Sequence, residues 1–428
     1  MRVRIHHAGV RFEEYVLAAP LLLSTGPVTH ATVATASVTV EAGGKTATGH
    51  GSICLSELWS WPDPSVEQNT RSLVMRAWCE WIASELHSLC GDSEAHPLEL
   101  GLRLNASLAG AGPLVHGQPR PWRLARTLCG SPFDAAIHDA AGIALSRSSF
   151  MLYDDNDPIP SADHLFPSSG ASSAIRALMS PRSGTREAWL IVGPKDDLPG
   201  EVGHRIEERG YRRFKLKLTG DPAVDAPFTA AAFRAARTAG AREAKLCADS
   251  NGATPGVQET VEYLERLRRD APEAFDSLQY IEQPTGRDLR RDGHDWRPVS
   301  RIKPVLVDEG LTGLDVLESV LEQGWSGLGL KTCKGHSLAL TAAAWAKQQN
   351  LAVSLQDLTN PGYAALHAAL FSGWVPTING LELNSPQYLP AANTRFARAC
   401  PDLFDPQKGV HALPPLDSVG LGSGLVAE

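Results

Sequence analysis

The chain has 428 residues, 43% of them hydrophobic and 21% charged, which is ordinary for a soluble protein of one large barrel or two to three domains. A net charge of −8 and a pI near 6.0 disfavour nucleic acid and anionic membranes as partners and favour a small molecule. The seven cysteines are scattered and form no C-x-x-C pair, which favours reduced thiols over disulfides or a zinc site.

Signals of several other protein classes are missing from the sequence. No apolar run is long enough to span a membrane, and Glu13 and Glu14 lie where a signal peptide would be apolar, so we expect a cytoplasmic protein. Gly44-Lys45-Thr46 is not a phosphate loop, because Thr39 stands where that motif needs glycine. There is also no G-x-S-x-G elbow and no H-E-x-x-H helix, so hydrolase and zinc-protease functions are disfavoured.

Residues 1–150 are predicted to form an α+β domain. Up to about residue 62, β-branched and small polar residues alternate around Gly43-Gly44, as in a β-hairpin. An apolar period of three to four residues then predicts helices over 65–87 and 132–146. The following segment, 151–186, is rich in Pro, Ser and Asp and is predicted to be a linker or flap with room for a short helix.

A regular alternation of short apolar strands and helices begins at residue 187. The predicted strands are 188–193, 213–219, 244–250, 278–283, 304–309, 327–333, 351–357 and 378–384. The fourth unit is the weakest, because 285–301 has little helical periodicity. Buried strands that alternate with helices in this way predict an α/β protein with a parallel (β/α)8 barrel over 187–385.

Charged residues end five successive predicted strands of this barrel. In chain order they are Lys217, Asp249, Glu282, Asp308 and Lys331. Each alone has a structural explanation, such as an Asx turn at Asp249 or a surface position for Lys331. Because the active site of such a barrel lies at the carboxyl ends of its strands, the five together predict one site.

Three carboxylates from consecutive strands predict a metal site. Their charges repel one another and raise the pKa values of the group unless a cation lies between them. Oxygen ligands without histidine or cysteine suit magnesium, or manganese, better than zinc. We therefore predict that Asp249, Glu282 and Asp308 bind Mg²⁺ and leave coordination positions for a substrate carboxylate.

The lysines predict proton transfer beside that metal. Lys215 and Lys217, two residues apart in the stretch FKLKLTG (214–220), share one face of a strand. In isolation this pattern is more often a solvated strand face, but here a second lysine, a nearby cation and exclusion of water favour neutral Lys217. Lys217 would remove the proton next to a carboxylate to give an ene-diolate, and Lys331 would return a proton or stabilise charge.

The motifs resemble the enolase superfamily, and within it the muconate lactonizing enzyme and dipeptide epimerase group of the mandelate racemase/muconate lactonizing enzyme family. The matching elements are K-x-K at 215–217, D-S-N at 249–251, I-E-Q-P at 281–284, V-D-E at 307–309 and L-K-T-C-K-G at 330–335. The resemblance implies that residues 1–150 cap a modified barrel and that residues 386–428 return to the cap.

The same resemblance implies roles for individual residues. It makes Lys217 and Lys331 an acid/base pair and Lys215 a modulator of Lys217. It makes Asp249, Glu282 and Asp308 the magnesium ligands. It also implies that the loops 24–32 and 49–63 close over the barrel mouth, with Trp59 and Trp61 in a position either to line the pocket or to pack at the domain junction.

Some positions depart from the family pattern. Gly335-His336 stands where Gly-Gly is common, and Gln356-Asp357 replaces the histidine of the mandelate racemase and sugar-acid dehydratase pattern. The eighth strand ends with Glu382-Leu383-Asn384, a half match to the D-x-D with which dipeptide epimerases hold an ammonium group. We expect Glu382, Asn384 and Asp357 to contact the substrate.

The sequence thus predicts a magnesium-dependent enzyme that abstracts the α-proton of a small carboxylic acid, as a racemase, an epimerase or a cycloisomerase. Two alternatives stay open, an acid-sugar dehydratase and a non-catalytic, metal-dependent carboxylate binder. Barrels of this type are often oligomeric, so a homo-oligomer is also open.

Overall fold

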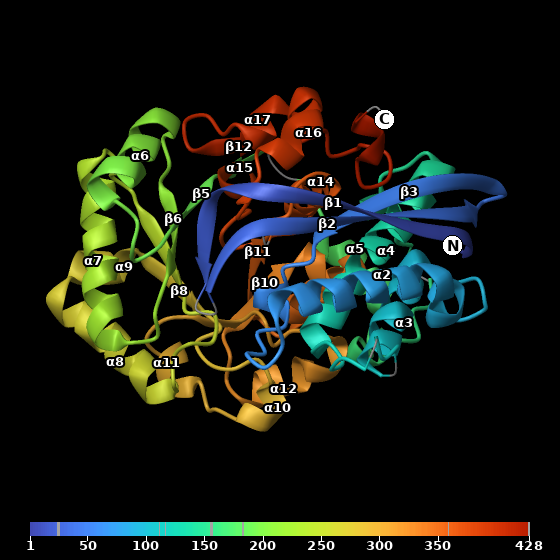
Figure 1. The fold of residues 1–428 in the computed structure, drawn as a ribbon. Helices are drawn as coiled ribbons and strands as arrows, with labels where there is room; N and C mark the ends of the chain where they lie inside the picture. Colours follow the sequence, from blue (N-terminus) through green and yellow to red (C-terminus); the bar gives the residue numbers. More distant parts are fainter. Residues whose placement is uncertain are drawn as a thin grey trace.

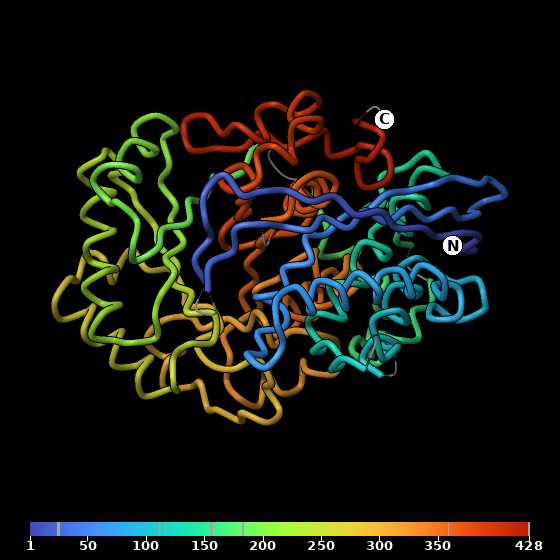
Figure 2. The backbone as a smooth tube through the Cα atoms, viewed as in Figure 1, coloured from blue at the N-terminus to red at the C-terminus, as the bar shows by residue number. Residues whose placement is uncertain are grey.

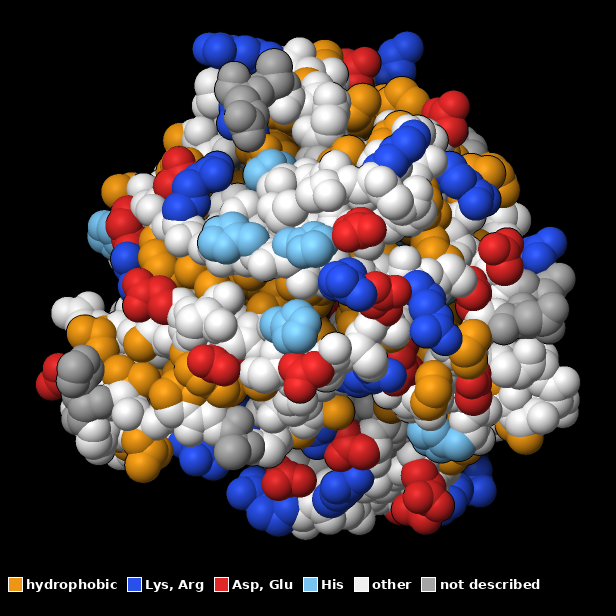
Figure 3. Space-filling model, turned by 90° about the vertical axis from the view of Figure 1, so that its right-hand side faces the viewer, with side chains coloured by type: hydrophobic (Ala, Val, Ile, Leu, Met, Phe, Trp, Pro, Cys, Tyr) orange, Lys and Arg blue, Asp and Glu red, His pale blue; other side chains and the backbone are white. Residues whose placement is uncertain are grey.

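The computed structural model describes residues 1–23, 26–110, 112–115, 117–154, 157–181, 184–357 and 359–426. A three-stranded sheet with helices α2–α4 lies on one side of a larger barrel (Figure 1). On the face seen in Figure 3, acidic and basic side chains are interspersed among polar and apolar ones. No helix in the described part of the chain is long and apolar enough to cross a membrane.

The cap, formed by β1–β3 and α1–α4, is built on an antiparallel sheet in the order β1-β2-β3. Its strands are β1 (Val3–Leu23), β2 (Gly26–Ala42) and β3 (Lys45–Cys54). The predicted Gly43-Gly44 turn joins β2 to β3, with φ angles of 58° and 72° that favour glycine. Gly51 lets β3 approach helix α4, since a Cβ there would lie 2.2 Å from the carbonyl oxygen of Pro132.

The cap helices are α1 (Glu57–Ser60), α2 (Gln68–Cys90), α3 (Pro97–Ala109) and α4 (Arg123–Leu145). The predicted helix at 65–87 corresponds to α2. The predicted helix at 132–146 is the second half of α4, which contains Pro132 inside it and begins nine residues earlier than predicted. Helix α3 was not predicted, because leucines at 98, 100, 102 and 104 alternate with a strand-like period of two.

Seven of the eight predicted barrel strands are present, in one parallel sheet of order β5 to β11. They are β5 (Trp189–Val192), β6 (Arg213–Lys217), β7 (Lys245–Asp249), β8 (Leu278–Glu282), β9 (Val305–Val307), β10 (Gly327–Lys331) and β11 (Ala352–Gln356). The surrounding helices are α6 (Gly203–Arg209), α7 (Pro222–Thr238), α8 (Val257–Asp270), α9 (Pro272–Ser277), α10 (Leu289–Asp292), α11 (Arg297–Ser300), α12 (Leu317–Glu322), α13 (His336–Gln348) and α14 (Tyr363–Trp374). The weak fourth unit contains only the two four-residue helices α10 and α11.

The prediction of a regular eighth strand at 378–384 was wrong. The segment pairs with β11 through a single bridge, Gln356 to Glu382. Gly380 has a φ of 72°, which interrupts the extended conformation, and the Asn379 side chain bonds to both the N–H and the C=O of Leu355, whose oxygen also accepts the Glu382 N–H. On the β5 side, the closing contacts are also made by side chains, because Gln387 bonds to the N–H and C=O of Ile191. The fold is therefore a modified barrel closed partly by side chains.

Alternation along the strands separates the two faces of the barrel wall. Trp189, Cys247, Tyr280 and Leu306 pack against one another as one cluster, whereas Phe214 and Leu216 belong to the larger core that includes the helices. Lys215 pairs with Cys247 in the register of β6 and β7, and Lys217 pairs with Asp249. The K-x-K face is therefore the face toward the barrel interior, at the carboxyl ends of the strands.

The segments on either side of the barrel are tied to each other and to the cap. The segment after the cap contains the short helix α5 (Ala171–Leu178), and its strand β4 (Thr185–Glu187) pairs with β12 (Val410–Ala412). The chain after the barrel contains α15 (Ser385–Tyr388), α16 (Thr394–Ala399) and α17 (Pro401–Phe404). It then runs back toward the cap (Figure 2), where Leu421 N–H donates to Asp139 of α4. The domain boundaries remain predictions.

Candidate active site

A cavity lies between the cap and the carboxyl ends of the barrel strands, with about 770 Å³ of empty space when the open solvent at its mouth is included. One wall is the ribbon, which we define as residues 15–23 of β1 and 26–33 of β2. Apart from the apolar Ile191 and Leu389, the residues that line the barrel side are charged or polar: Lys215, Lys217, Asp249, Asn251, Lys331, Thr359, Glu382 and Asn384. The predicted loop 24–32 falls partly outside the described residues, but its described part contributes Val28, His30 and Ala31 to the lining.

Lys215 lies at the centre of the charged side. Its Nζ is 2.7 Å from Glu282 Oε2, 3.2 Å from Asp249 Oδ2 and 3.3 Å from Glu382 Oε2. Burial alone would lower the pKa of Lys215, but these carboxylates raise it well above its ordinary value. Lys215 is thus held as a cation inside the barrel.

Lys217 lies nearer the cavity and shares a partner with Lys215. Its Nζ donates to Asp249 Oδ2 at 2.8 Å and to Asn251 Oδ1 at 3.1 Å. Asn251 has a φ of 48°, a conformation that few residues other than glycine adopt, and its Nδ2 donates to both Asp249 and Glu309. Asn251 is therefore a site residue that the prediction did not assign, although it belongs to the D-S-N motif.

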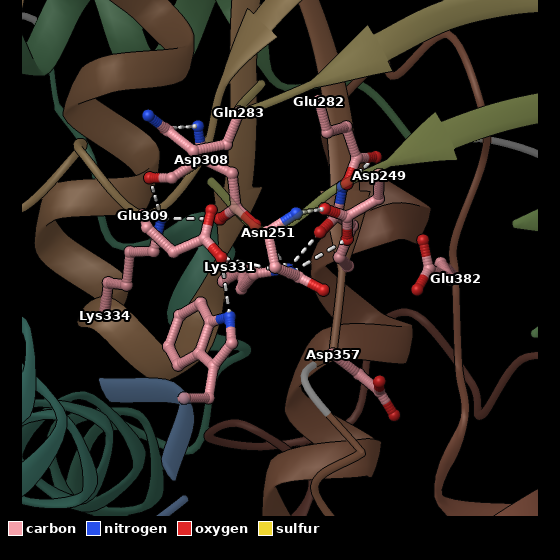
Figure 4. A network of polar contacts seen from close by, with 12 residues as sticks. Asp249, Asn251, Glu282, Gln283, Asp308, Glu309, Lys331, Lys334, Asp357 and Glu382 are labelled. Atoms are coloured by element: carbon pink, nitrogen blue, oxygen red, sulfur yellow. Dashed lines mark hydrogen bonds and ion pairs between the residues drawn. The ribbon is translucent and has the colours of Figure 1, made fainter. Parts of the chain in front are cut away.

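Lys331 and Lys334 approach Asp308 from the opposite side of the site. Lys331 Nζ lies 3.2 Å from Asp308 Oδ2, and Lys334 Nζ lies 2.9 Å from Asp308 Oδ1 (Figure 4). Opposed by burial, these lysines lower the pKa of Asp308. Lys331 lines the cavity and Lys334 does not, which separates the two lysines of the L-K-T-C-K-G motif.

Gln356 connects the two lysine groups. Its Oε1 accepts hydrogen bonds from Lys331 and from Lys215, and its Nε2 donates to Glu282. The sequence analysis assigned the neighbouring Asp357 instead. Alternation along β11 could have identified Gln356, because a strand that ends with a residue facing the interior turns the next side chain away.

Asp357 has a different environment from the other predicted substrate-binding residues. Its carboxylate accepts the backbone N–H groups of Thr359, Asn384 and Ser385, and it is not among the described residues that line the cavity. In Figure 4 no dashed line joins it to the network. Burial raises its pKa to about 7. The structure therefore gives Asp357 a position that stabilises the loops after β11, and we do not keep it in the functional proposal.

Glu382 and Asn384 do line the cavity. Asn384 Nδ2 donates to Glu382 Oε1 at 2.8 Å, while Glu382 Oε2 faces Lys215. The structure thus brings these two residues close to Lys215. Because Glu382 already faces the ammonium of Lys215, it is a poor partner for the ammonium of a substrate.

Trp59 and Glu309 join the cap to the barrel. Trp59 Nε1 donates to Glu309 Oε1 at 2.9 Å, and Arg287 donates to the Trp59 carbonyl oxygen. The Lys331 Nζ lies 5.6 Å from the centre of the Trp59 ring. Trp61 is fully buried in the cap core and is not part of the cavity lining. Trp59 therefore lines the pocket, whereas Trp61 packs in the core of the cap.

The predicted metal ligands offer suitable oxygen atoms. Asp249, Glu282 and Asp308 are at most 1% exposed. Glu282 Oε2 and Asp308 Oδ2 face lysines but accept no hydrogen bond of good geometry. Burial raises the pKa of Glu282 to about 7, opposed by Lys215, whereas Lys217 and Lys215 outweigh burial and lower the pKa of Asp249. All donors are oxygen, which suits a hard divalent cation, but the ligand atoms of these three residues do not all lie within 4.8 Å of one another.

A second group of potential ligands lies deeper in the barrel. Among the described residues, Cys247, Glu282 and Glu382 are the one set of three whose ligand atoms all lie within 4.8 Å of one another. Lys215 Nζ contacts both glutamates, so an ammonium group already neutralises this set.

Comparison with known proteins gives the family. The family described as "Enolase C-terminal domain-like" matches residues 198–425, just over half of the chain. No curated protein sequence matches.

Solved structures match along nearly the whole chain. An enolase from Bradyrhizobium complexed with magnesium and mandelic acid is 18% identical with a TM-score of 0.62, and the match covers 100% of this chain and 96% of that one. A dipeptide epimerase from Cytophaga hutchinsonii complexed with Mg and D-Ala-L-Val is 16% identical with a TM-score of 0.62, covering 99% and 95%. A muconate lactonizing enzyme from Pseudomonas fluorescens complexed with muconolactone is 16% identical with a TM-score of 0.64, covering 98% and 96%. The family match and the shared fold lead to one conclusion: the chain belongs to the enolase superfamily, in its mandelate racemase/muconate lactonizing enzyme-like group.

Proposed function

We propose that the protein is a magnesium-dependent enzyme that removes the α-proton of a carboxylic acid, as a racemase or epimerase or as a cycloisomerase. One observation carries the proposal. Lys217 on β6 and Lys331 on β10 line the same cavity, and the strands β7, β8 and β9 between them carry Asp249, Glu282 and Asp308. This arrangement supports two lysines acting on opposite sides of one substrate carbon.

The proton transfers follow from that placement. Neutral Lys217 Nζ takes the α-proton, and the electron pair of the broken C–H bond delocalises into the carboxylate as an ene-diolate. In a racemase, the ammonium of Lys331 donates a proton to the opposite face of the carbon; in a cycloisomerase, it stays protonated and stabilises negative charge. Asp249, Glu282 and Asp308 would hold magnesium, whose positive charge would stabilise the substrate carboxylate and the ene-diolate.

The remaining residues position these groups. Lys215 is held as a cation by three carboxylates, and it shares Asp249 Oδ2 with Lys217, which places it to modulate that lysine. Gln356 occupies the end of β11, where the dehydratase alternative would need a histidine. A non-catalytic binder has no need for lysines on both sides of the carboxylates. The racemase, epimerase or cycloisomerase reaction is therefore favoured over both alternatives.

The test is deuterium incorporation at the α-carbon, in D₂O with magnesium, across dipeptides, N-acyl amino acids, hydroxy acids and unsaturated acids. We expect Lys217→Ala to reduce exchange by about 10²–10⁴-fold, the usual contribution of a general base. Lys245→Ala is the matched control, because Lys245 lies at the opposite end of the neighbouring strand β7. Unchanged exchange in Lys217→Ala would falsify the proposal. If exchange is lost as expected, Lys331→Ala separates racemisation from cycloisomerisation.

A further inference from the structure

The two walls of the cavity differ in chemistry. The barrel wall carries the lysines and carboxylates described above, whereas the ribbon presents Leu17, Leu21, Leu23, Val28 and Ala31. We infer that the substrate carries an apolar group, without a second charge, at the end remote from the reacting carboxylate. This inference rests on the proposed function, which places that carboxylate among the lysines.

Strand geometry produces the apolar wall. Leu21 and Leu23 are two residues apart on β1, so they project to the same side, and Leu21 pairs with Val28 of β2. Leu17, beyond the register shift, lines the same cavity. The neighbouring Val16, on the other side, is 67% exposed, whereas Leu17 is 8% exposed. The register of β1 and β2 shifts between Val16 and Leu21, next to Pro20, as expected where proline occurs within a strand.

Barrel residues complete the apolar wall. Leu17 belongs to a buried hydrophobic cluster with Ile191 of β5 and Leu389, which follows α15, and Leu21 and Val28 pack against that cluster. Ile191 and Leu389 also line the cavity. The ribbon is thus fixed to the barrel by the same apolar contacts that form the wall, and the wall is present before any ligand binds.

The charged groups of the cavity leave a remote charge without a partner. Among the described lining residues, the cap contributes no lysine or arginine, and its basic residue is His30, an exposed histidine whose Nδ1 lies 2.9 Å from Thr29 Oγ1. A remote carboxylate would therefore be desolvated without a permanent cation. Glu57 is the acidic residue that the cap contributes, and it is 7% exposed. Burial raises the pKa of Glu57, which favours its neutral form and makes it a weak partner for a remote ammonium group.

The test varies the side chain, which we call the tail, while the rest of the acid is kept constant. N-acetyl amino acids, α-hydroxy acids and dipeptides are each prepared with an isobutyl, a carboxyethyl or an aminobutyl side chain, and their dissociation constants for the magnesium-loaded protein are measured by calorimetry. We expect the isobutyl member to bind at least about tenfold more tightly than the charged members, which is the lower limit for one apolar group in a fitted pocket.

A charge placed in the wall should reverse this preference. Leu21→Lys is expected to shift the preference at least about tenfold toward the carboxyethyl tail. Val16→Lys, on the exposed side of the same strand, is the control and should leave the preference unchanged. If Leu21→Lys does not fold, Leu21→Gln is used instead and should weaken binding of the isobutyl member. Tighter binding of a charged tail, equal binding of all tails, or no binding by any scaffold overturns the inference. If acids with a charged side chain undergo Lys217-dependent exchange, this inference is overturned but the proposed function stands. If the isobutyl member binds best but no acid undergoes exchange, the proposed function is overturned but the binding preference stands.

Discussion

The barrel side and the cap side of the cavity are built by different means. On the barrel side, single polar residues at the ends of five strands converge because parallel strands end at one edge. On the cap side, the wall consists of common apolar residues on a long hairpin whose register is shifted between Val16 and Leu21. In the proposed function, the reaction would therefore depend on a few strand-end positions of the barrel, whereas substrate choice would depend on the apolar surface of the ribbon.

The largest expected effect comes from a variant on the barrel side, and it tests whether magnesium binding there can be lost without changing the substrate preference of the cap side. Glu282→Gln removes one charge from the predicted metal ligands while keeping the size of the side chain. We expect magnesium affinity, measured by calorimetry, to fall by on the order of 100-fold or more, since even partners outside the ligand set are worth about 10–100-fold. Proton exchange should fall with it, while the preference for apolar tails, measured on the variant, should stay.

The control for this variant is Asp357→Asn. Asp357 is also a fully buried acid, but its carboxylate accepts three backbone N–H groups outside the cavity lining. The Asp357→Asn variant should keep wild-type magnesium affinity but have a lower free energy of unfolding. Equal magnesium affinity in wild type and Glu282→Gln would remove Glu282 from the proposed ligand set.

The next effect concerns the junction between the two sides. Trp59→Phe keeps an aromatic ring over Lys331 but removes the hydrogen bond to the buried carboxylate of Glu309, whose other oxygen has no partner among the described residues. Leaving a buried acceptor with one donor fewer should cost about 1–3 kcal/mol. The measurement is the free energy of unfolding from urea titration.

Trp61→Phe is a matched control two residues away. Trp61 is also buried, but its Nε1 makes no hydrogen bond in the described structure. Both variants lose the same atoms, so the extra loss in Trp59→Phe reports the hydrogen bond. A loss in Trp61→Phe as large as that in Trp59→Phe would show that packing alone accounts for the effect, and that the junction adds nothing specific.

Most of the barrel could be predicted because its signals are local. Buried strands read as short apolar runs, and Lys217, Asp249 and Glu282 stand at strand ends whatever the rest of the chain does. The prediction of the eighth strand failed because its sequence is apolar and strand-like, while the interruption depends on Gly380 adopting a positive φ and on the Asn379 side chain bonding to the Leu355 backbone. Helix α3 was missed because a period of two in its leucines concealed a helix buried on several sides.

The charged residues of the site were predictable, because a lysine or carboxylate at the end of a buried strand has few structural uses. Gln356 and Asn251 were missed because a neutral amide at a strand end has many structural uses, and only the three-dimensional contacts with Lys331 and Lys217 single them out. Asp357 was assigned because an acid attracts attention, although its partners are backbone groups. The resemblance placed the loop 24–32 over the barrel mouth, but the leucines of β1 could not be assigned to the cavity, since they resemble those of any other hydrophobic strand.

The smallest expected effect is a pH dependence of stability at the junction of cap and barrel. His138 of α4, His336 of α13 and His367 of α14 are buried together, with His336 Nδ1 2.7 Å from His367 Nε2. Burial lowers all three pKa values, that of His367 to about 3. Histidine in the unfolded chain titrates near about 6.5, so below that pH the unfolded chain binds more protons than the folded one. The stabilisation is complete above about pH 6.5 and is lost as the pH falls toward the folded value.

For each such histidine, the free energy of unfolding falls by at most about 1.4 kcal/mol for each unit by which the pH is lowered in this range. His367→Gln should reduce the slope of unfolding free energy against pH between 6 and 5 by about this amount, whereas His204→Gln, at an exposed position on α6, should not. Neighbouring Asp134, whose pKa burial raises to about 6, acts in the opposite direction below that pH. Because Asp134 is present in both proteins, its contribution cancels when the variant is compared with wild type. An unchanged slope in His367→Gln would mean that His367 takes up its proton in the folded protein near its ordinary pKa, and that the junction of the cap and the barrel opens to water in solution.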